Sequence, residues 1–258
     1  MVERRPIRRS PMKPMKTSRD RETVEPPIGL MPGVRLYRLP TALHVESEHA
    51  LSCLSSAVLG GGLLRTHHIL NLGVPADYQC GNHLADLQHA ARQRNIIDPF
   101  VGMLTAARIA DAQVVVERDD VATVAAIVTL GISHPTAAGV SQSARRAGPG
   151  TINTIVLVDG KLSPAAQVNA VITATEAKSL VMAECSVRTP EGHLASGTGS
   201  DALVVASTER GAHFEYGGPI SHVGAMIGRA VRAATLNAVF VWHARRQTAQ
   251  TEHIATSG

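Results

Sequence analysis

Short apolar runs separated by polar turns predict several strands in this chain. Residues 51–59 form one such run, which leads into three consecutive glycines at 60–62. Two further runs, 113–117 and 121–132, flank an Arg-Asp-Asp turn. Because apolar runs on both sides of a tight turn are typical of a hairpin, these two runs are expected to pair with each other.

Helical spacing of apolar residues marks three other segments. In residues 81–94 the apolar positions recur at three- and four-residue intervals. A second helix is expected at 164–185, because Ser163 is a good N-cap and Pro164 suits the first helical position. A last helix is expected from residue 221 through residue 238.

A crossover unit follows from the order of these elements. Residues 152–158 predict a strand that ends at an Asp-Gly turn, and residues 201–206 predict a strand that is apolar on both faces. With the helix between them, two such strands form a right-handed parallel crossover. A hairpin beside a crossover indicates an α/β fold, a single domain with a mixed β-sheet covered by helices.

Charge is unevenly distributed along the chain. The net charge is +4, but residues 1–22 alone hold eight Lys or Arg and three acids, so the remainder is close to neutral. We therefore expect a disordered basic N-terminal tail at 1–33, one domain at 34–244 and a flexible C-terminal tail at 245–258. The domain has no nucleic-acid motif and no basic excess, so no nucleic-acid partner is expected.

Cellular location is suggested by the cysteines and by the apolar runs. The three cysteines include no CxxC pair, which fits a reducing, cytoplasmic environment. The longest apolar run, 121–132, is shorter than the roughly 18–20 residues of a membrane span, so no membrane association is expected. No apolar segment follows the charged N-terminus, as it would in a secretory signal.

Glu176 is the first candidate for chemistry. On the predicted helix it shares a row with Val168, Ile172 and Leu180, which places a carboxylate on an apolar stripe. A buried carboxylate needs a partner or has a raised pKa, and such groups are frequent in active sites. The alternative is a structural carboxylate that caps a backbone amide or pairs with an Arg. Lys178 lies two positions further on, so it reaches another wall of the site or only solvent.

Polar residues at the mouths of two predicted strands form a second set of candidates. A Ser-Gly-Thr-Gly-Ser-Asp loop at 196–201 precedes one strand, and Asp201 closes it. Its glycines allow the backbone to approach a ligand, but no GK[ST] follows, so it is not a P-loop. The alternative is an Asx-type turn. Thr151 and Asn153 open the other strand and could donate hydrogen bonds to a substrate amide or cap the turn.

Metal and serine-nucleophile chemistry have little support in the sequence. Twelve histidines are present, but the Cys80–His83 pair has no second pair nearby to complete a zinc site. Ser55 and Ser56 lie in an apolar run without a GxSxG pattern. We therefore expect neither a bound metal nor a serine-hydrolase triad.

Several stretches together resemble the adenosylcobinamide amidohydrolase family. They are LSSAVLGGGL at 54–63, ILNLGVPADY at 69–78, GTINTIVLVD at 150–159, ATEAKSLVM at 174–182 and GTGSDALVVA at 197–206, with a weaker match at 217–231. The likeness covers roughly residues 35 to 240. Two positions depart from the family pattern: Gly60 stands where Asn is usual, and Ser200 stands where a Thr is usual.

The resemblance implies a reaction and a set of site residues. The enzyme would hydrolyse the amide between the aminopropanol arm and the corrin ring of adenosylcobinamide, with the cobalt corrinoid as substrate and no other cofactor. Within these stretches we expect Glu176, Asp201, Lys178 and Thr198 to be catalytic, and the substrate to be bound by Gly61, Gly62, Asn71, Thr151, Asn153, Gly199 and Ser200. Glu176 or Asp201 would act as base, and backbone amides of loops 197–200 or 60–62 would stabilise the oxyanion.

Two alternatives to this enzyme stay open. The chain could be a corrinoid-binding or sensing module that has lost catalysis, for which Gly60 is the only support. It could also be an unrelated amidase or thioesterase on the same fold. A homo-oligomer is possible, since the sequence does not set the oligomeric state.

Overall fold

The computed structural model describes residues 25–78, 82–143 and 150–256, of which 251–256 are described by their backbone alone. Most of the predicted N-terminal tail therefore lies outside the described residues. No helix in the described part of the chain is both long and apolar enough to cross a membrane.

The main element is a nine-stranded mixed sheet in the order β1-β2-β3-β12-β9-β7-β6, with β4 on the other edge of β3 and β5 beside β4. Its strands are β1 Ile28–Met31, β2 Val34–Leu39, β3 Ala42–Ser55, β4 Gly62–Gly73, β5 Val101–Thr105, β6 Gln113–Arg118, β7 Thr123–Leu130, β9 Ile152–Asp159 and β12 Ala202–Ser207.

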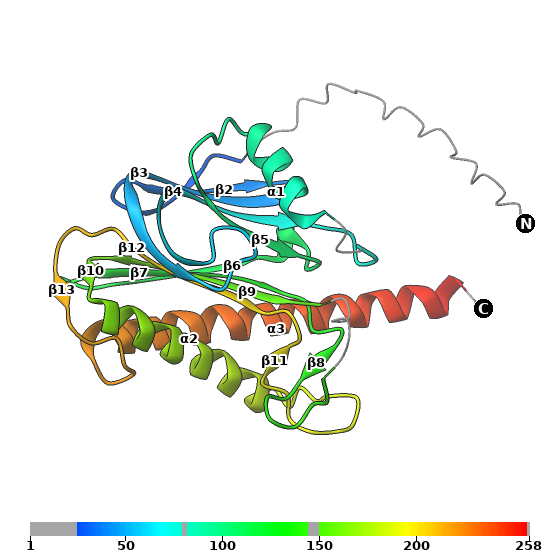
Figure 1. Ribbon diagram of the computed structural model, residues 1–258. Coiled ribbons are helices and arrows are strands. Elements are labelled where there is room, and N and C mark those ends of the chain that lie inside the picture. The colour runs from blue at the N-terminus through cyan, green and yellow to red at the C-terminus, as the bar shows by residue number, and fades with distance from the viewer. Residues whose placement is uncertain (1–24, 79–81, 144–149, 257–258) are drawn as a thin grey trace, which may run out of the picture.

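A register shift between Glu46 and Leu51 interrupts the pairing of β3 with β4. Such irregularities bend a strand pair, and the sheet here forms two layers (Figure 1). The upper layer holds β1, β2, β4, β5 and the first half of β3. The lower layer holds β12, β9, β7 and β6, and α2 (Pro164–Glu184) and α3 (His222–Thr256) lie beneath it. The predicted fold class, α/β with a mixed sheet covered by helices, is confirmed.

Two cores hold these three layers together. Between the sheet layers lie apolar side chains from both, including Leu43 and Met103 above and Ile127 and Ile155 below. Along the lower strands, alternate residues face the helices instead. Val128 of β7, Val156 of β9 and Val205 of β12 belong to the core that packs on α2 and α3. A third, smaller core lies under α1 (His83–Arg92), which packs on β4 and β5. The central strands are therefore buried on both faces, as their continuous apolar sequence predicts.

The predicted crossover is also confirmed. β9 and β12 pair in parallel, and α2 connects them. The Ser163 hydroxyl accepts a hydrogen bond of 3.0 Å from the backbone amide of Ala166, and Pro164 is the first helical residue. The predicted hairpin is formed by β6 and β7, where the Asp119 carboxylate accepts hydrogen bonds from the amides of Val121 and Ala122.

The described termini differ from the sequence expectation. β1 lies inside the segment expected to be a tail, because Leu30 and Met31 are buried in the core between the sheet layers. At the other end, α3 continues through residues 245–256, where a flexible tail was expected. An ion pair between Arg245 and Asp111 joins this extension to the body of the domain.

The remaining elements are short. A 3-10 helix covers Ile109–Asp111, β8 (Pro135–Thr136) pairs with β11 (Gly197–Thr198), and β10 (Lys161–Leu162) pairs with β13 (His213–Phe214). The β8–β11 pair matters for the site, because it holds the glycine loop that precedes β12.

Candidate functional site

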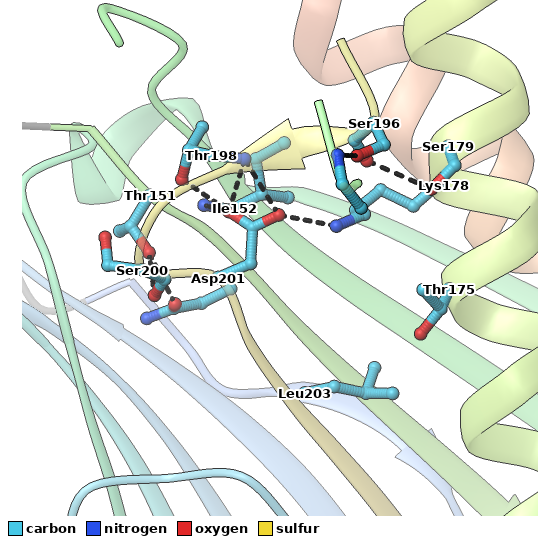
Figure 2. A network of polar contacts seen from close by, with 12 residues as sticks. Thr151, Ile152, Thr175, Lys178, Ser179, Ser196, Thr198, Ser200, Asp201 and Leu203 are labelled. Carbon is cyan, nitrogen blue, oxygen red and sulfur yellow. Dashed lines mark hydrogen bonds and ion pairs between the residues drawn. The ribbon is translucent and has the colours of Figure 1, made fainter. Parts of the chain in front are cut away.

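Asp201 is the centre of a polar network at the start of β12 (Figure 2). Its Oδ2 atom lies 2.5 Å from the Lys178 ammonium of α2. Its Oδ1 atom accepts hydrogen bonds from the Thr198 hydroxyl at 2.5 Å and from the backbone amide of Ile152 at 3.0 Å. The Thr198 amide donates to the same carboxylate at 3.2 Å. Asp201 therefore connects α2, β9 and its own loop, and most of its acceptor capacity is used.

The glycine loop approaches this ion pair closely. A Cβ atom on Gly197 would collide with the Asp201 carboxylate and would lie 2.6 Å from the Lys178 ammonium. Only glycine fits at position 197 without displacing these two side chains, which accounts for one of the two glycines of the loop. The Ser179 hydroxyl donates to the carbonyl of Ser196 at 3.0 Å, so α2 also holds the beginning of the loop.

Ser200 and Thr151 join the loop to the start of β9. The Ser200 hydroxyl donates to the carbonyl of Gly150 at 2.9 Å, and the Thr151 hydroxyl donates to the carbonyl of Ser200 at 2.8 Å. Gly150 has a φ of +132°, a value that L-residues with a side chain rarely adopt. The two strand mouths are thus fixed against each other by hydrogen bonds that need a hydroxyl at both 151 and 200.

Asn71 and Asn153 form a buried polar contact between the two sheet layers. The Asn153 amide nitrogen donates to Asn71 Oδ1 at 2.8 Å and to the carbonyl of Leu104 at 2.8 Å. The Asn71 amide nitrogen donates to the Thr129 hydroxyl at 3.0 Å. Both Asn side chains are 1% exposed. Because buried polar groups are stable only when paired, this network fixes the position of β4 and β5 over β9.

A cavity of about 540 Å³ opens beside these networks. Six segments line it: the chain after β3, the chain after β4, the start of α1, the end of β5, and the residues that open β9 and β12. The lining residues are Ser56, Val58, Val74, Pro75, Ala76, Asp77, Tyr78, His83, Met103, Leu104, Thr105, Ala106, Gly150, Thr151, Ser200, Asp201 and Ala202. It has the size and the mixed apolar and polar lining of a small-molecule site.

The structure brings together some of the predicted site residues. Thr151, Ser200 and Asp201 line the cavity. Lys178 and Thr198 lie behind Asp201 and bind its carboxylate. Asn153 is one step further in, where its amide nitrogen donates to Asn71 and to the carbonyl of Leu104. Gly199 lies within the same loop, although it is not among the residues that line the cavity.

Other predicted residues lie elsewhere. Glu176 is on the exposed face of α2, so the expectation that it is buried is wrong. Its row companions Val168, Ile172 and Leu180 are about half exposed. The helix instead buries a face of mostly small residues, namely Ala166, Gln167, Ala170, Thr173, Ala174, Val181 and Met182.

Gly61 and Gly62 are also exposed, and they do not line the cavity. Gly61 belongs to the turn between β3 and β4, and Gly62 is the first residue of β4. Of the chain between these strands, only Ser56 and Val58 reach the cavity wall. A Cβ atom on Gly61 would lie 2.5 Å from the carbonyl oxygen of Ala57, so this glycine is required by the turn itself.

Five polar residues of the cavity were not among the expected site residues: Ser56, Asp77, Tyr78, His83 and Thr105. Asp77 and Tyr78 end one of the stretches that carry the family resemblance, which was the available signal. His83 was considered only as half of a metal-binding pair. Within the described residues, no three His, Cys, Asp or Glu side chains are grouped to hold a metal ion.

A family model described as adenosylcobinamide amidohydrolase matches residues 28–247. The chain belongs to the adenosylcobinamide amidohydrolase family. The match begins at the first residue of β1 and ends within α3, so it includes residues 28–33 and 245–247 of the two segments that were expected to be tails.

Individual relatives match shorter segments. An adenosylcobinamide amidohydrolase of Methanosarcina mazei is 35% identical over 58% of this chain and 67% of its own length. One of Halobacterium salinarum is 36% identical over 43% of this chain and 48% of its own length. An uncharacterized protein of Methanocaldococcus jannaschii is 36% identical over 35% of this chain and 36% of its own length. The matched segments thus span between about a third and two thirds of these relatives.

A solved structure of a Pyrococcus horikoshii protein covers 78% of this chain and 78% of its own. Its TM-score is 0.41 at 15% identity, a likeness too low to bear on the fold or the activity of this family member.

Proposed function

We propose that the protein hydrolyses the amide between the aminopropanol arm and the corrin ring of adenosylcobinamide, releasing adenosylcobyric acid and 1-amino-2-propanol. The observation that carries this proposal is the cavity lined by Gly150, Thr151, Ser200 and Asp201. These residues belong to two of the stretches that mark the family, and the family model covers all of them.

The chemistry of the cavity suits an amide. Hydrolysis of an unactivated amide needs a group that transfers protons and donors that stabilise the oxyanion. Hydroxyls of Ser56, Thr105 and Thr151 line the wall, and an imidazole and carboxylates lie among them. The apolar remainder of the wall favours exclusion of water, which strengthens such polar interactions.

The size of the cavity indicates how the substrate would enter. At about 540 Å³ it suits a group of drug-like size, whereas a corrinoid with its adenosyl ligand is larger. We infer that the aminopropanol arm and its amide enter the cavity while the flat ring stays at the mouth. Exposed Val58 at the rim offers an apolar contact for the ring.

We further propose that the cobalt corrinoid enters as the substrate, with no other cofactor, and that the reaction takes place in the cytoplasm. The cysteines support the second point, because Cys53 is buried as a free thiol and Cys185 is also unpaired. Free thiols of this kind are common where glutathione keeps cysteines reduced.

Incubation of the purified protein with adenosylcobinamide tests the activity. Mass spectrometry should detect 1-amino-2-propanol and a corrinoid acid in equal amounts, and adenosylcobyric acid added alone should stay unchanged. Retention of intact adenosylcobinamide on the protein without release of either product would instead identify a corrinoid-binding module.

A further inference from the structure

His83 lies at the wall of the cavity and is the first residue of α1. Its Nδ1 atom is buried and has no hydrogen-bond partner among the described protein atoms. Buried polar atoms in folded proteins are paired in the great majority of cases, and the exceptions are often groups with a catalytic role. No hydrogen bond among the described residues therefore engages Nδ1 of His83.

The helix that carries His83 is held in place by contacts on two sides. The Tyr78 hydroxyl donates to the Asp86 carboxylate at 2.5 Å, which joins the chain after β4 to the first turn of α1. Leu87 and Ala91 pack the same helix on β4 and β5. Since β5 ends at Thr105, another residue of the cavity wall, His83 has a fixed position relative to that wall. A catalytic group needs this kind of rigid support.

The other titratable groups of the cavity are less suited to transfer a proton. Asp201 binds Lys178, Thr198 and the amide of Ile152, so its carboxylate is already occupied. The Tyr78 hydroxyl is engaged with Asp86. Asp77 lies in an exposed segment at the rim.

We propose that His83 is the general base and general acid of the amide hydrolysis, an inference that rests on the proposed function. The imidazole accepts one proton from a water molecule as the water oxygen forms a bond to the amide carbon. It then returns this proton to the arm nitrogen as the carbon–nitrogen bond breaks and its electron pair leaves with nitrogen. The products are a carboxylic acid and an amine, and no oxidant or reductant is required.

Histidine suits this role because its side chain can both accept and donate a proton near neutral pH. The titratable groups around His83 are Asp77 and Tyr78 from the chain after β4, Asp86 one turn along α1 and Asp201 at the start of β12. The cavity residues from β5 and from the start of β9 carry no charge. A pH dependence that is lost on replacement of His83 alone therefore reports on this imidazole.

The test compares His83→Ala with His89→Gln in single-turnover assays with adenosylcobinamide. His89 is an exposed histidine of the same helix and serves as the matched control. We expect His83→Ala to lower the rate by about 10²–10⁴-fold, the usual contribution of a general acid–base group. The melting temperature and the retention of corrinoid should change little, and added imidazole should restore part of the rate.

A second measurement does not depend on the stability of the alanine variant. The rate of the wild-type protein should fall toward low pH, and His83→Gln should lose this acid limb while His89→Gln keeps it. Near-normal turnover of His83→Ala, or failure of imidazole to raise its rate, would overturn the role of His83 while the amidohydrolase function stands. A wild-type protein that binds adenosylcobinamide without cleaving it would overturn both.

Discussion

Lys178 of α2 and Asp201 at the start of β12 form an ion pair with 2.5 Å between Nζ and Oδ2, and their side chains are only 13% and 17% exposed. The pair connects a helix to the loop that forms one wall of the cavity. The contacts of Asp201 with the loop and with β9 indicate a structural role for this carboxylate. From the sequence, Asp201 was expected to be catalytic.

Asp201→Asn should destabilise the fold more than it impairs the chemistry. The change leaves the Lys178 ammonium without its counter-charge, and removal of one partner from a mostly buried pair costs about 3 kcal/mol. Urea unfolding should show this loss. The double variant Lys178→Met with Asp201→Asn should regain part of the stability, because no unpaired charge remains. A single-turnover rate that falls a hundredfold in a fully folded Asp201→Asn protein would contradict the structural role.

Glu176→Gln should leave both turnover and melting temperature unchanged. The side chain is exposed on α2 and makes no hydrogen bond or ion pair with the described residues. Substitutions at such positions usually change stability by less than about 0.5 kcal/mol. Parallel assays of turnover and thermal unfolding check this, and a large loss of rate would return Glu176 to the set of catalytic candidates.

The two glycines Gly60 and Gly62 should respond differently to alanine. Both have a positive φ, of +67° and +83°, which costs a side-chain-bearing residue about 1–2 kcal/mol. A Cβ atom on Gly60 would in addition lie 2.5 Å from the carbonyl oxygen of Phe100, whereas no atom lies within 4 Å of one on Gly62. Chemical denaturation should therefore show a larger loss for Gly60→Ala. Equal losses would mean that the loop shifts freely around residue 60.

His44 should make the stability of the fold depend on pH. Burial, together with the charge of nearby His68, lowers the pKa of His44 from its ordinary value of 6.5 to about 4. Between these two values the unfolded chain binds a proton that the folded protein does not, so stability is lost as pH falls from 6.5 toward 4. The size of the effect is about 3 kcal/mol.

Urea unfolding at several pH values measures this loss. In His44→Gln the loss over the same interval should be smaller, whereas His49→Gln, a change at an exposed histidine of the same strand, should follow the wild type. Identical pH profiles for His44→Gln and the wild type would show that other groups cause the acid sensitivity.

Local signals in the sequence were sufficient for the hairpin and the crossover. The turn at Asp119 and the N-cap at Ser163 each act within a few residues, and both are present in the structure. The bend of β3 and the second sheet layer could not be predicted, because they depend on pairing between distant strands. The sequence therefore placed Thr151, Ser200 and Asp201 correctly at strand mouths but gave no indication that α1 adds His83 to the same cavity.

The orientation of α2 was mispredicted for a different reason. The row of α2 that contains Val168, Ile172 and Leu180 is strongly hydrophobic, and this row was expected to be buried. In the structure α2 packs directly on α3, and a Cβ atom on Gly228 of α3 would lie 3.7 Å from the Thr173 methyl group of α2. The Thr173 hydroxyl also donates to the carbonyl of Gly217, in the chain just before α3, at 2.9 Å. Only small side chains such as Ala170 fit at this distance, so size rather than hydrophobicity decides which face is inside.

The pairing of β3 with β12 has a consequence for synthesis of the chain. Ser55 lies opposite Val204, almost 150 residues later in the sequence. As the polypeptide leaves the ribosome, the last residues of β3 expose an unpaired strand edge until the crossover has been made, and such edges promote aggregation. A nascent chain stalled before β12 should therefore bind chaperones. The chain should leave them while the final third of the message is translated.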